Sequence, residues 1–257
     1  MFLRAYNPET CFLCGASGDL TGEHKIKASA IRSEFGSEKM VIGRFGVPDG
    51  GFRSVQGPKS KNLHFDAKVC RTCNSERTQA ADREFDRFNR SARLLLNSGQ
   101  DPGGVFEEER YCVGSPAYLN VFRYFAKLLC CHIAELNGPM PLHMARFAIG
   151  QVNQNCVWLT VDRDVTYAEA VQAMGEHQYA AHGGLVVYGD KHTGEANAFH
   201  STLTVGPLRY VFYSRLNWLE RLELRWAHRE FRDRVRELTG AAQMQPLTDA
   251  EKRRLGL

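Results

Sequence analysis

The sequence predicts an α+β protein in two parts: a small N-terminal domain over residues 1–98 that cysteines staple together, and a mixed α/β domain of unassigned type over residues 105–257. Three observations lead to this prediction. Two identical Cys-x-x-Cys pairs occur within the first 75 residues. Short strand-like apolar stretches and runs of helical periodicity follow one another along the chain. The Gly- and Pro-containing stretch 99–104 is the best candidate for a linker between the two parts.

The composition narrows the class of protein. The chain has 257 residues, of which 43% are apolar and 24% charged, as in an ordinary globular protein. No stretch approaches the ~18–20 consecutive apolar residues of a membrane-spanning helix, so we expect no membrane partner. The first residues contain no apolar core of signal-peptide length. The expected location is therefore the cytoplasm.

The eight cysteines are of two kinds. Two pairs share the Cys-x-x-Cys spacing, Cys11 with Cys14 and Cys70 with Cys73. In a cytosolic chain, two such pairs are typical of a four-thiolate zinc site, since the spacing lets a tight turn aim both sulfurs at one tetrahedral ion. Such a zinc ion is structural, because four thiolates leave no position for water. The remaining cysteines are expected to be buried structural thiols, namely Cys112, Cys130, Cys131 and Cys156.

The N-terminal part is predicted to form these elements in order. Residues 8–24 form a zinc knuckle, and residues 25–35 form a short helix or a loop. Residues 40–56 form a hairpin with its turn at 48–51, and residues 57–62 are a basic loop. A short strand leads into the second cysteine pair. A helix with one apolar face then runs from about residue 72 to Asn97.

The C-terminal part begins with a helix that Ser115-Pro116 should start and Asn137-Gly138 should end. This helix is apolar around most of its circumference, which predicts that it lies at the centre of its domain. The later elements predicted are, in chain order, strands at 146–151 and 156–161, a helix at 167–175, a strand at 184–188, a hairpin over 199–214 broken at 205–207, and an Arg-rich helix at about 216–239. The last helix is interpreted mainly as an exposed face, and a homodimer contact is its second interpretation.

A further set of residues lies between and after the cysteine pairs. Glu23-His24 follows the first pair, Asn62-Leu63 precedes the second pair, and Asn74 directly follows the last cysteine. In this order the pattern resembles the four-cysteine, zinc-containing branch of the HNH endonuclease family, over roughly residues 8–90. The resemblance implies a ββα-metal finger, in which a strand hairpin and a helix hold one catalytic divalent ion.

The resemblance also implies a role for each matching residue. His24 corresponds to the general base, and Glu23 corresponds to the acidic ligand of a catalytic Mg²⁺ or Mn²⁺ ion. Asn74 is a second oxygen ligand of that ion, and Asn62 holds the loop of the hairpin. The four paired cysteines correspond to the ligands of the structural zinc. The implied activity is metal-dependent hydrolysis of DNA phosphodiester bonds that leaves 5′-phosphate and 3′-hydroxyl ends, with a role in phage defence or a mobile element.

These residue types suit the chemistry in their own right. Hydrolysis of a phosphodiester needs an activated water and a cation for the developing charge. A neutral imidazole is a suitable base near pH 7, and a hard ion such as Mg²⁺ prefers oxygen ligands. Glu23 and His24 are adjacent, so on a strand their side chains point to opposite faces. Both serve one site only if the backbone bends there or the metal sits at the end of the strand.

Basic residues near the motif are candidates for binding the substrate. Residues 1–100 contain 16 Lys and Arg against 11 Asp and Glu, so the whole positive excess of the chain lies there. Arg71 and Arg77 flank the expected helix start and are predicted to contact phosphate, as is Lys61 in the basic loop. Solvated surface arginines are the alternative interpretation of Arg71 and Arg77. For the segment that contains Lys61, the alternative is a surface hairpin that closes on its own aromatic residues. His64 is interpreted as a structural histidine, with a phosphate contact as its alternative.

Two other functions stay open on the sequence. The first is a non-catalytic zinc-finger module that binds nucleic acid, with the C-terminal part contacting a protein partner. It requires zinc but no Mg²⁺. The second is a redox protein that uses its Cys-x-x-Cys pairs as dithiols, which bound zinc would exclude.

Overall fold

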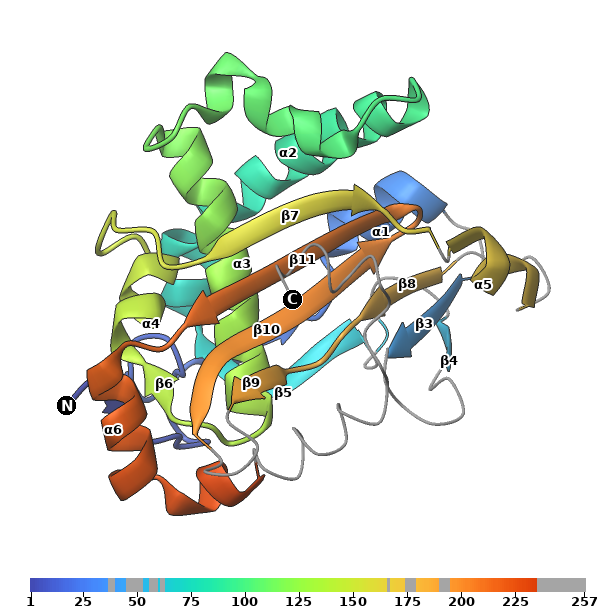
Figure 1. Cartoon of the computed structure of the whole chain (residues 1–257). Helices are drawn as coiled ribbons and strands as arrows, with labels where there is room; N and C mark the ends of the chain where they lie inside the picture. The colour runs from blue at the N-terminus through green and yellow to red at the C-terminus, as the bar shows by residue number, and fades with distance from the viewer. Residues whose placement is uncertain are drawn as a thin grey trace.

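The computed structural model describes residues 1–36, 40–44, 53–55, 60, 63–165, 167–173, 179–189 and 195–234 (Figure 1). Up to residue 97 the elements are β1 (Leu3–Arg4), β2 (Leu20–His24), α1 (Ala28–Phe35), β3 (Met40–Arg44), β4 (Arg53–Val55), β5 (His64–Cys70), the π-helical turn η2 (Cys73–Arg77) and α2 (Gln79–Asn97). From residue 102 they are the 3-10 turns η3 (Pro102–Glu107) and η4 (Glu109–Tyr111), α3 (Pro116–Glu135), β6 (Met140–Pro141), α4 (Leu142–Ala148), β7 (Trp158–Arg163), α5 (Tyr167–Ala173), β8 (Tyr179–His182), β9 (Val186–Gly189), β10 (Ala196–Val205), β11 (Leu208–Arg215) and α6 (Trp218–Ala227).

The N-terminal part contains a strand pair followed by a helix. β2 and β5 are antiparallel, with Leu20 opposite Cys70, and an irregularity between Gly22 and His24 shifts their register. β5 runs directly into η2 and α2, so the second cysteine pair lies where the strand becomes a helix. Residues 25–35, for which the sequence predicts either a short helix or a loop, contain the helix α1.

A seven-stranded sheet connects the two parts of the chain. Among the described strands its order is β4-β3-β8-β10-β11-β7, and β9 also pairs with β10. The predicted hairpin at 40–56 is present as the antiparallel pair of β3 and β4, although its turn at 48–51 lies outside the described residues. β3 pairs in parallel with β8. The segment between the cysteine pairs therefore supplies two strands to a sheet whose other strands follow residue 157.

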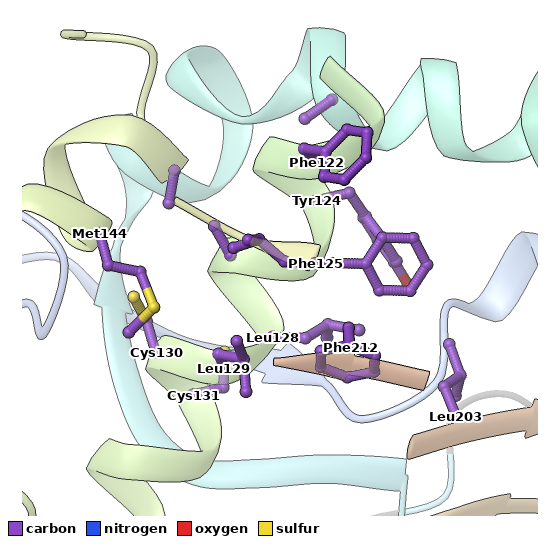
Figure 2. Close-up of a cluster of buried hydrophobic side chains, with 14 of the residues drawn as sticks. Phe122, Tyr124, Phe125, Leu128, Leu129, Cys130, Cys131, Met144, Leu203 and Phe212 are labelled. Atoms are coloured by element: carbon purple, nitrogen blue, oxygen red, sulfur yellow. The ribbon is translucent and has the colours of Figure 1, made fainter. Parts of the chain in front are cut away.

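The predicted central helix is confirmed as α3. The Ser115 hydroxyl caps it by accepting a hydrogen bond from the Tyr118 N–H, and Pro116 occupies the first turn. Figure 1 shows α3 passing behind β10 and β11. Phe125 of α3 lies with its ring centre 5.0 Å from that of Phe212 in β11 (Figure 2). α3 is buried over most of its length, as its apolar girth predicted.

One of the predicted C-terminal elements is wrong. Residues 146–151, predicted as a strand, form the end of the helix α4 up to Ala148 and the turn that follows it, and Met144, Ala145 and Phe147 of α4 are buried. Their short apolar run fits a buried helix turn as well as a strand. The helix predicted at about 216–239 is present but interrupted: α6 ends at Ala227, His228 leaves helical geometry with φ −127° and ψ 53°, and residues 229–234 are helical again. Residues 235–239 lie outside the described residues. The hairpin at 199–214 is confirmed as β10 and β11, with Gly206 at φ +58° in its turn.

α2 and α3 pack against each other across the predicted linker. The ring of Phe85 in α2 stacks on Tyr124 in α3 at 3.9 Å between centres, and the Tyr210 hydroxyl of β11 donates to Asn89 of α2 at 2.6 Å. Buried residues of residues 1–98 and 105–231 belong to one continuous core. The division into two domains stays a prediction. None of the helices in the described ranges combines the length and the apolar character needed to cross a bilayer.

The core position of Phe125 makes it a test of the packing. Phe125→Ala should lower the free energy of unfolding by about 3–5 kcal/mol, because it removes a ring that contacts α2 and β11 and leaves a cavity. Leu94→Ala on the exposed side of α2, where Leu94 is 64% exposed, should change it by less than about 0.5 kcal/mol. Denaturant unfolding measures both, and equal losses in the two variants would contradict the assigned core.

Candidate functional site

The four paired cysteines converge on one point. Cys11 and Cys14 lie in a turn closed by hydrogen bonds from Cys11 N–H to the Ala16 carbonyl and from Gly15 N–H to the Cys11 carbonyl. Gly15 has φ +81°, a conformation that suits glycine. Cys70 ends β5 and Cys73 begins η2. All four sulfur atoms lie within 4.8 Å of one another, so the group can hold a metal ion such as zinc.

The donor set and its surroundings fit zinc. Tetrahedral Zn–S bonds of about 2.3 Å place sulfurs about 3.8 Å apart, and Cys14 Sγ lies 3.7 Å from Cys70 Sγ. A hydrogen bond from Cys73 lowers the pKa of the Cys11 thiol to about 4 and raises the pKa of Cys73. Convergence of both pairs on one centre favours metal binding over two separate dithiols. Of the other cysteines, Cys130 and Cys131 are buried as expected, whereas Cys112 is exposed and Cys156 is half-buried.

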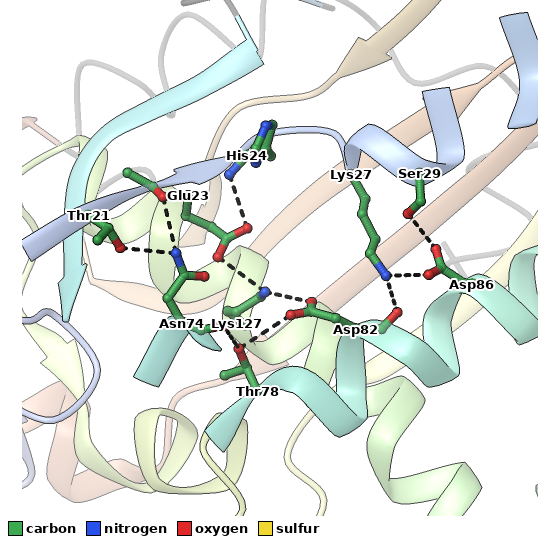
Figure 3. A network of polar contacts seen from close by, with 11 residues as sticks. Thr21, Glu23, His24, Lys27, Ser29, Asn74, Thr78, Asp82, Asp86 and Lys127 are labelled. Atoms are coloured by element: carbon green, nitrogen blue, oxygen red, sulfur yellow. Dashed lines mark hydrogen bonds and ion pairs between the residues drawn. The ribbon is translucent and has the colours of Figure 1, made fainter. Parts of the chain in front are cut away.

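Glu23 is engaged in a buried ion pair. Its Oε2 atom lies 3.2 Å from Nζ of Lys127, which also lies 2.7 Å from Oδ1 of Asp82 (Figure 3). Glu23 Oε1 accepts a hydrogen bond from the His24 N–H at 3.0 Å. Burial alone would lower the pKa of Lys127, but the charges of Glu23 and Asp82 outweigh it and raise that pKa above its usual value. Lys127 is therefore an ammonium ion inside the protein.

Asn74 lies against the strand that carries the Glu23-His24 pair. Its amide nitrogen donates to Thr21 Oγ1 at 3.0 Å and to the Gly22 carbonyl at 3.3 Å. Figure 3 shows the Asn74 and Glu23 side chains on the side of β2 that faces Lys127. The His24 ring points to the other side of β2, as adjacent strand residues do. The structure thus brings Glu23 and Asn74 together and turns the His24 ring away from them.

His24 has a second histidine beside it. The two strands place His64 opposite His24, and the ring centres are 4.1 Å apart. The Nδ1 atom of His64 lies 3.1 Å from the Ser60 carbonyl, which assigns its proton to Nδ1 and leaves Nε2 as an acceptor. Both residues are half-buried. The sequence indicated His64 only as an isolated histidine, because its pairing depends on the strand register.

The remaining predicted site residues lie as follows. Asn62 and Lys61 are outside the described residues. Arg71 and Arg77 are both exposed, but the Arg77 guanidinium donates to Cys73 Sγ at 3.8 Å and so faces the cysteine group. Sequence reasoning missed Lys127, and its available signal was a lone charged residue within the apolar run of α3.

A divalent ion does not fit beside Lys127 in this arrangement. The Glu23 carboxylate already has an ammonium counter-ion and an N–H donor. The amide nitrogen of Asn74 is committed to β2, which leaves only its oxygen for an ion. Glu23 and Asp82 carry two negative charges together, fewer than the three positive charges of Lys127 and a divalent ion next to it.

The cysteine group should control the folding of the N-terminal part. Cys73→Ser should abolish binding of one zinc ion and lower the thermal stability sharply, because structural zinc contributes ~10–16 kcal/mol of apparent binding free energy in small fingers. Cys112→Ser, which changes an exposed thiol, is the control and should leave zinc content and melting temperature unchanged. Metal analysis and thermal unfolding test this, and a Cys73→Ser protein of normal stability would contradict it.

Comparisons with family models, with curated proteins and with solved structures find no match to this chain. The function has to be argued from the residues of the site.

Proposed function

We propose that this chain is an endonuclease of the HNH type that hydrolyses DNA phosphodiester bonds. The observation that supports it most is the contact of Asn74 with β2 at Thr21 and Gly22, directly before Glu23-His24. This contact joins two of the motif segments that carry the resemblance, Glu23-His24 and Asn74, while Asn62 lies outside the described residues. The antiparallel β2 and β5, followed by η2 and α2, agree with the ββα order that the resemblance implies.

In this proposal His24 is the general base. Its half-exposed imidazole removes a proton from a water molecule, which attacks the phosphorus and releases a 3′-hydroxyl. His64, with its ring 4.1 Å from that of His24, limits the orientations that the His24 ring can adopt. Arg71 is exposed and available to a phosphate oxygen. The zinc-bound cysteines fix β5 against the turn at residues 11–14.

The proposal includes Mg²⁺ or Mn²⁺ as the catalytic cofactor and DNA as the partner. When bound, the ion supplies positive charge for the developing phosphorane, and Glu23 and Asn74 are its named ligands. In this structure Lys127 holds Glu23, so the steps above describe only what the residues of this chain do, and cleavage still requires the ion. A homodimer is the proposed assembly, and the exposed stripe Trp218, Leu222 and Trp226 on α6 supports it.

The Glu23–Lys127 pair favours a second candidate function. A carboxylate that is already neutralised by an internal ammonium is not available as a ligand for a catalytic ion. The alternative is a non-catalytic zinc module that binds nucleic acid through its basic N-terminal part, while the C-terminal part contacts another protein. This module would bind DNA with a steep salt dependence and would not cleave it.

A plasmid-nicking assay of the zinc-loaded full chain separates the two candidates. The nuclease proposal predicts nicking that requires added Mg²⁺ or Mn²⁺ and falls by at least about 10²-fold in His24→Ala, through loss of the base. His228→Ala, at the end of α6, is the matched control and should retain activity. Unchanged cleavage in His24→Ala would remove the base assignment. DNA binding without cleavage under any divalent ion would replace the nuclease by the binding module.

A further inference from the structure

Lys127 is a charged group beside the site that the proposed chemistry does not use. It lies in the middle of α3, and 1% of it is exposed to solvent. Most of α3 packs into the apolar core, yet this residue extends its ammonium to the Glu23 carboxylate that the nuclease proposal assigns to a metal. Burying a charge in an apolar core costs free energy, so we expect this ammonium to have a role.

The surroundings of the Lys127 ammonium have the chemistry of a hard-cation site. Glu23 and Asp82 supply two carboxylates, and Thr78 donates its hydroxyl hydrogen bond to Asp82 Oδ2 at 3.4 Å (Figure 3). The face of the Tyr124 ring lies 5.6 Å from Nζ and adds a favourable cation–π contact. Oxygen ligands of this kind also bind Mg²⁺ and Mn²⁺.

The two ion pairs of Lys127 are unequal. Nζ lies 2.7 Å from Asp82 and 3.2 Å from Glu23. Asp82 belongs to α2, which packs against α3, whereas Glu23 belongs to β2. The ammonium can therefore keep its closer partner while it releases Glu23.

We propose that Lys127 is a built-in cation that occupies the Glu23 site and competes with a divalent ion for it. Loading by Mg²⁺ or Mn²⁺ requires the ammonium to release Glu23 and to remain with Asp82. The inference rests on the proposed function in one respect, the assignment of Glu23 as a cation ligand. It makes the C-terminal part of the chain, through α3, a regulator of the metal site in the N-terminal part.

Mn²⁺ binding to the zinc-loaded full chain tests this directly. Lys127→Met should bind one Mn²⁺ ion at least about tenfold more tightly than the natural chain, because it removes a like charge within a few ångströms. Adding Glu23→Gln to Lys127→Met should abolish the gain. Lys27→Met is the control, since Lys27 forms its ion pair with Asp86 on the same helix α2 and reaches Asp82 only at its backbone carbonyl, not at the carboxylate of the site (Figure 3). Electron paramagnetic resonance of free Mn²⁺ gives the affinities.

Lys127→Met leaves two buried carboxylates without a counter-ion and can unfold the protein. A second variant, Lys127→Met with Asp82→Asn, keeps the net charge of the three side chains unchanged and retains Glu23 as a ligand. Mn²⁺ should raise the melting temperature of this double variant by more than it raises that of the natural chain or of Lys27→Met. The double variant decides the test where the single variant does not fold.

The competition is overturned if the folded double variant binds Mn²⁺ no more tightly than the natural chain. It is also overturned if the natural chain already binds Mn²⁺ at Glu23 as tightly as the variants do. These measurements need no cleavage, so their failure is distinct from that of the nuclease. A chain that gains Mn²⁺ affinity in the variant but never cuts DNA supports the competition and contradicts the nuclease. An active, Mg²⁺-dependent chain without the gain contradicts the competition alone.

Discussion

The convergence of four cysteine sulfurs is the constraint on which the N-terminal part depends. It joins residues 11–14 to residues 70–73, so a loop of 55 residues is closed at one point. Inside that loop are β2, α1, β3, β4 and β5 up to its last residue. With the loop closed, β2 is held against β5 at the register that places His24 opposite His64. The positions of the motif residues follow from this closure.

α3 contributes both packing and charge to the molecule. Its apolar side chains fill the space between α2, α4 and the sheet, and Lys127 carries a positive charge into the same interior. An ammonium buried in this way is tolerated only because two carboxylates and an aromatic face surround it. The same contacts couple the position of the Glu23 carboxylate to that of α3 in this structure.

The sequence predicted what depends on local spacing. The cysteine pairs, the caps of α3 and the β10–β11 hairpin could be recognised because their signals lie within a few residues of each other. The prediction of a strand at 146–151 is wrong because Phe147, Ala148 and Ile149 form an apolar run that is too short to distinguish the period of a helix from that of a strand. Lys127 could not be assigned to the site at all, because it lies 104 positions after Glu23 and only the packing of α3 on α2 and β5 brings the two side chains together.

The pairing of β3 with β8 has a consequence for how the chain can be divided. β3 lies between the cysteine pairs, and β8 is supplied from beyond residue 178, in parallel register from Val41 to Arg44. A fragment that stops after α2 would leave the backbone donors and acceptors of this edge exposed to water. Exposed strand edges of this kind recruit strands from other molecules, so such a fragment is prone to self-association.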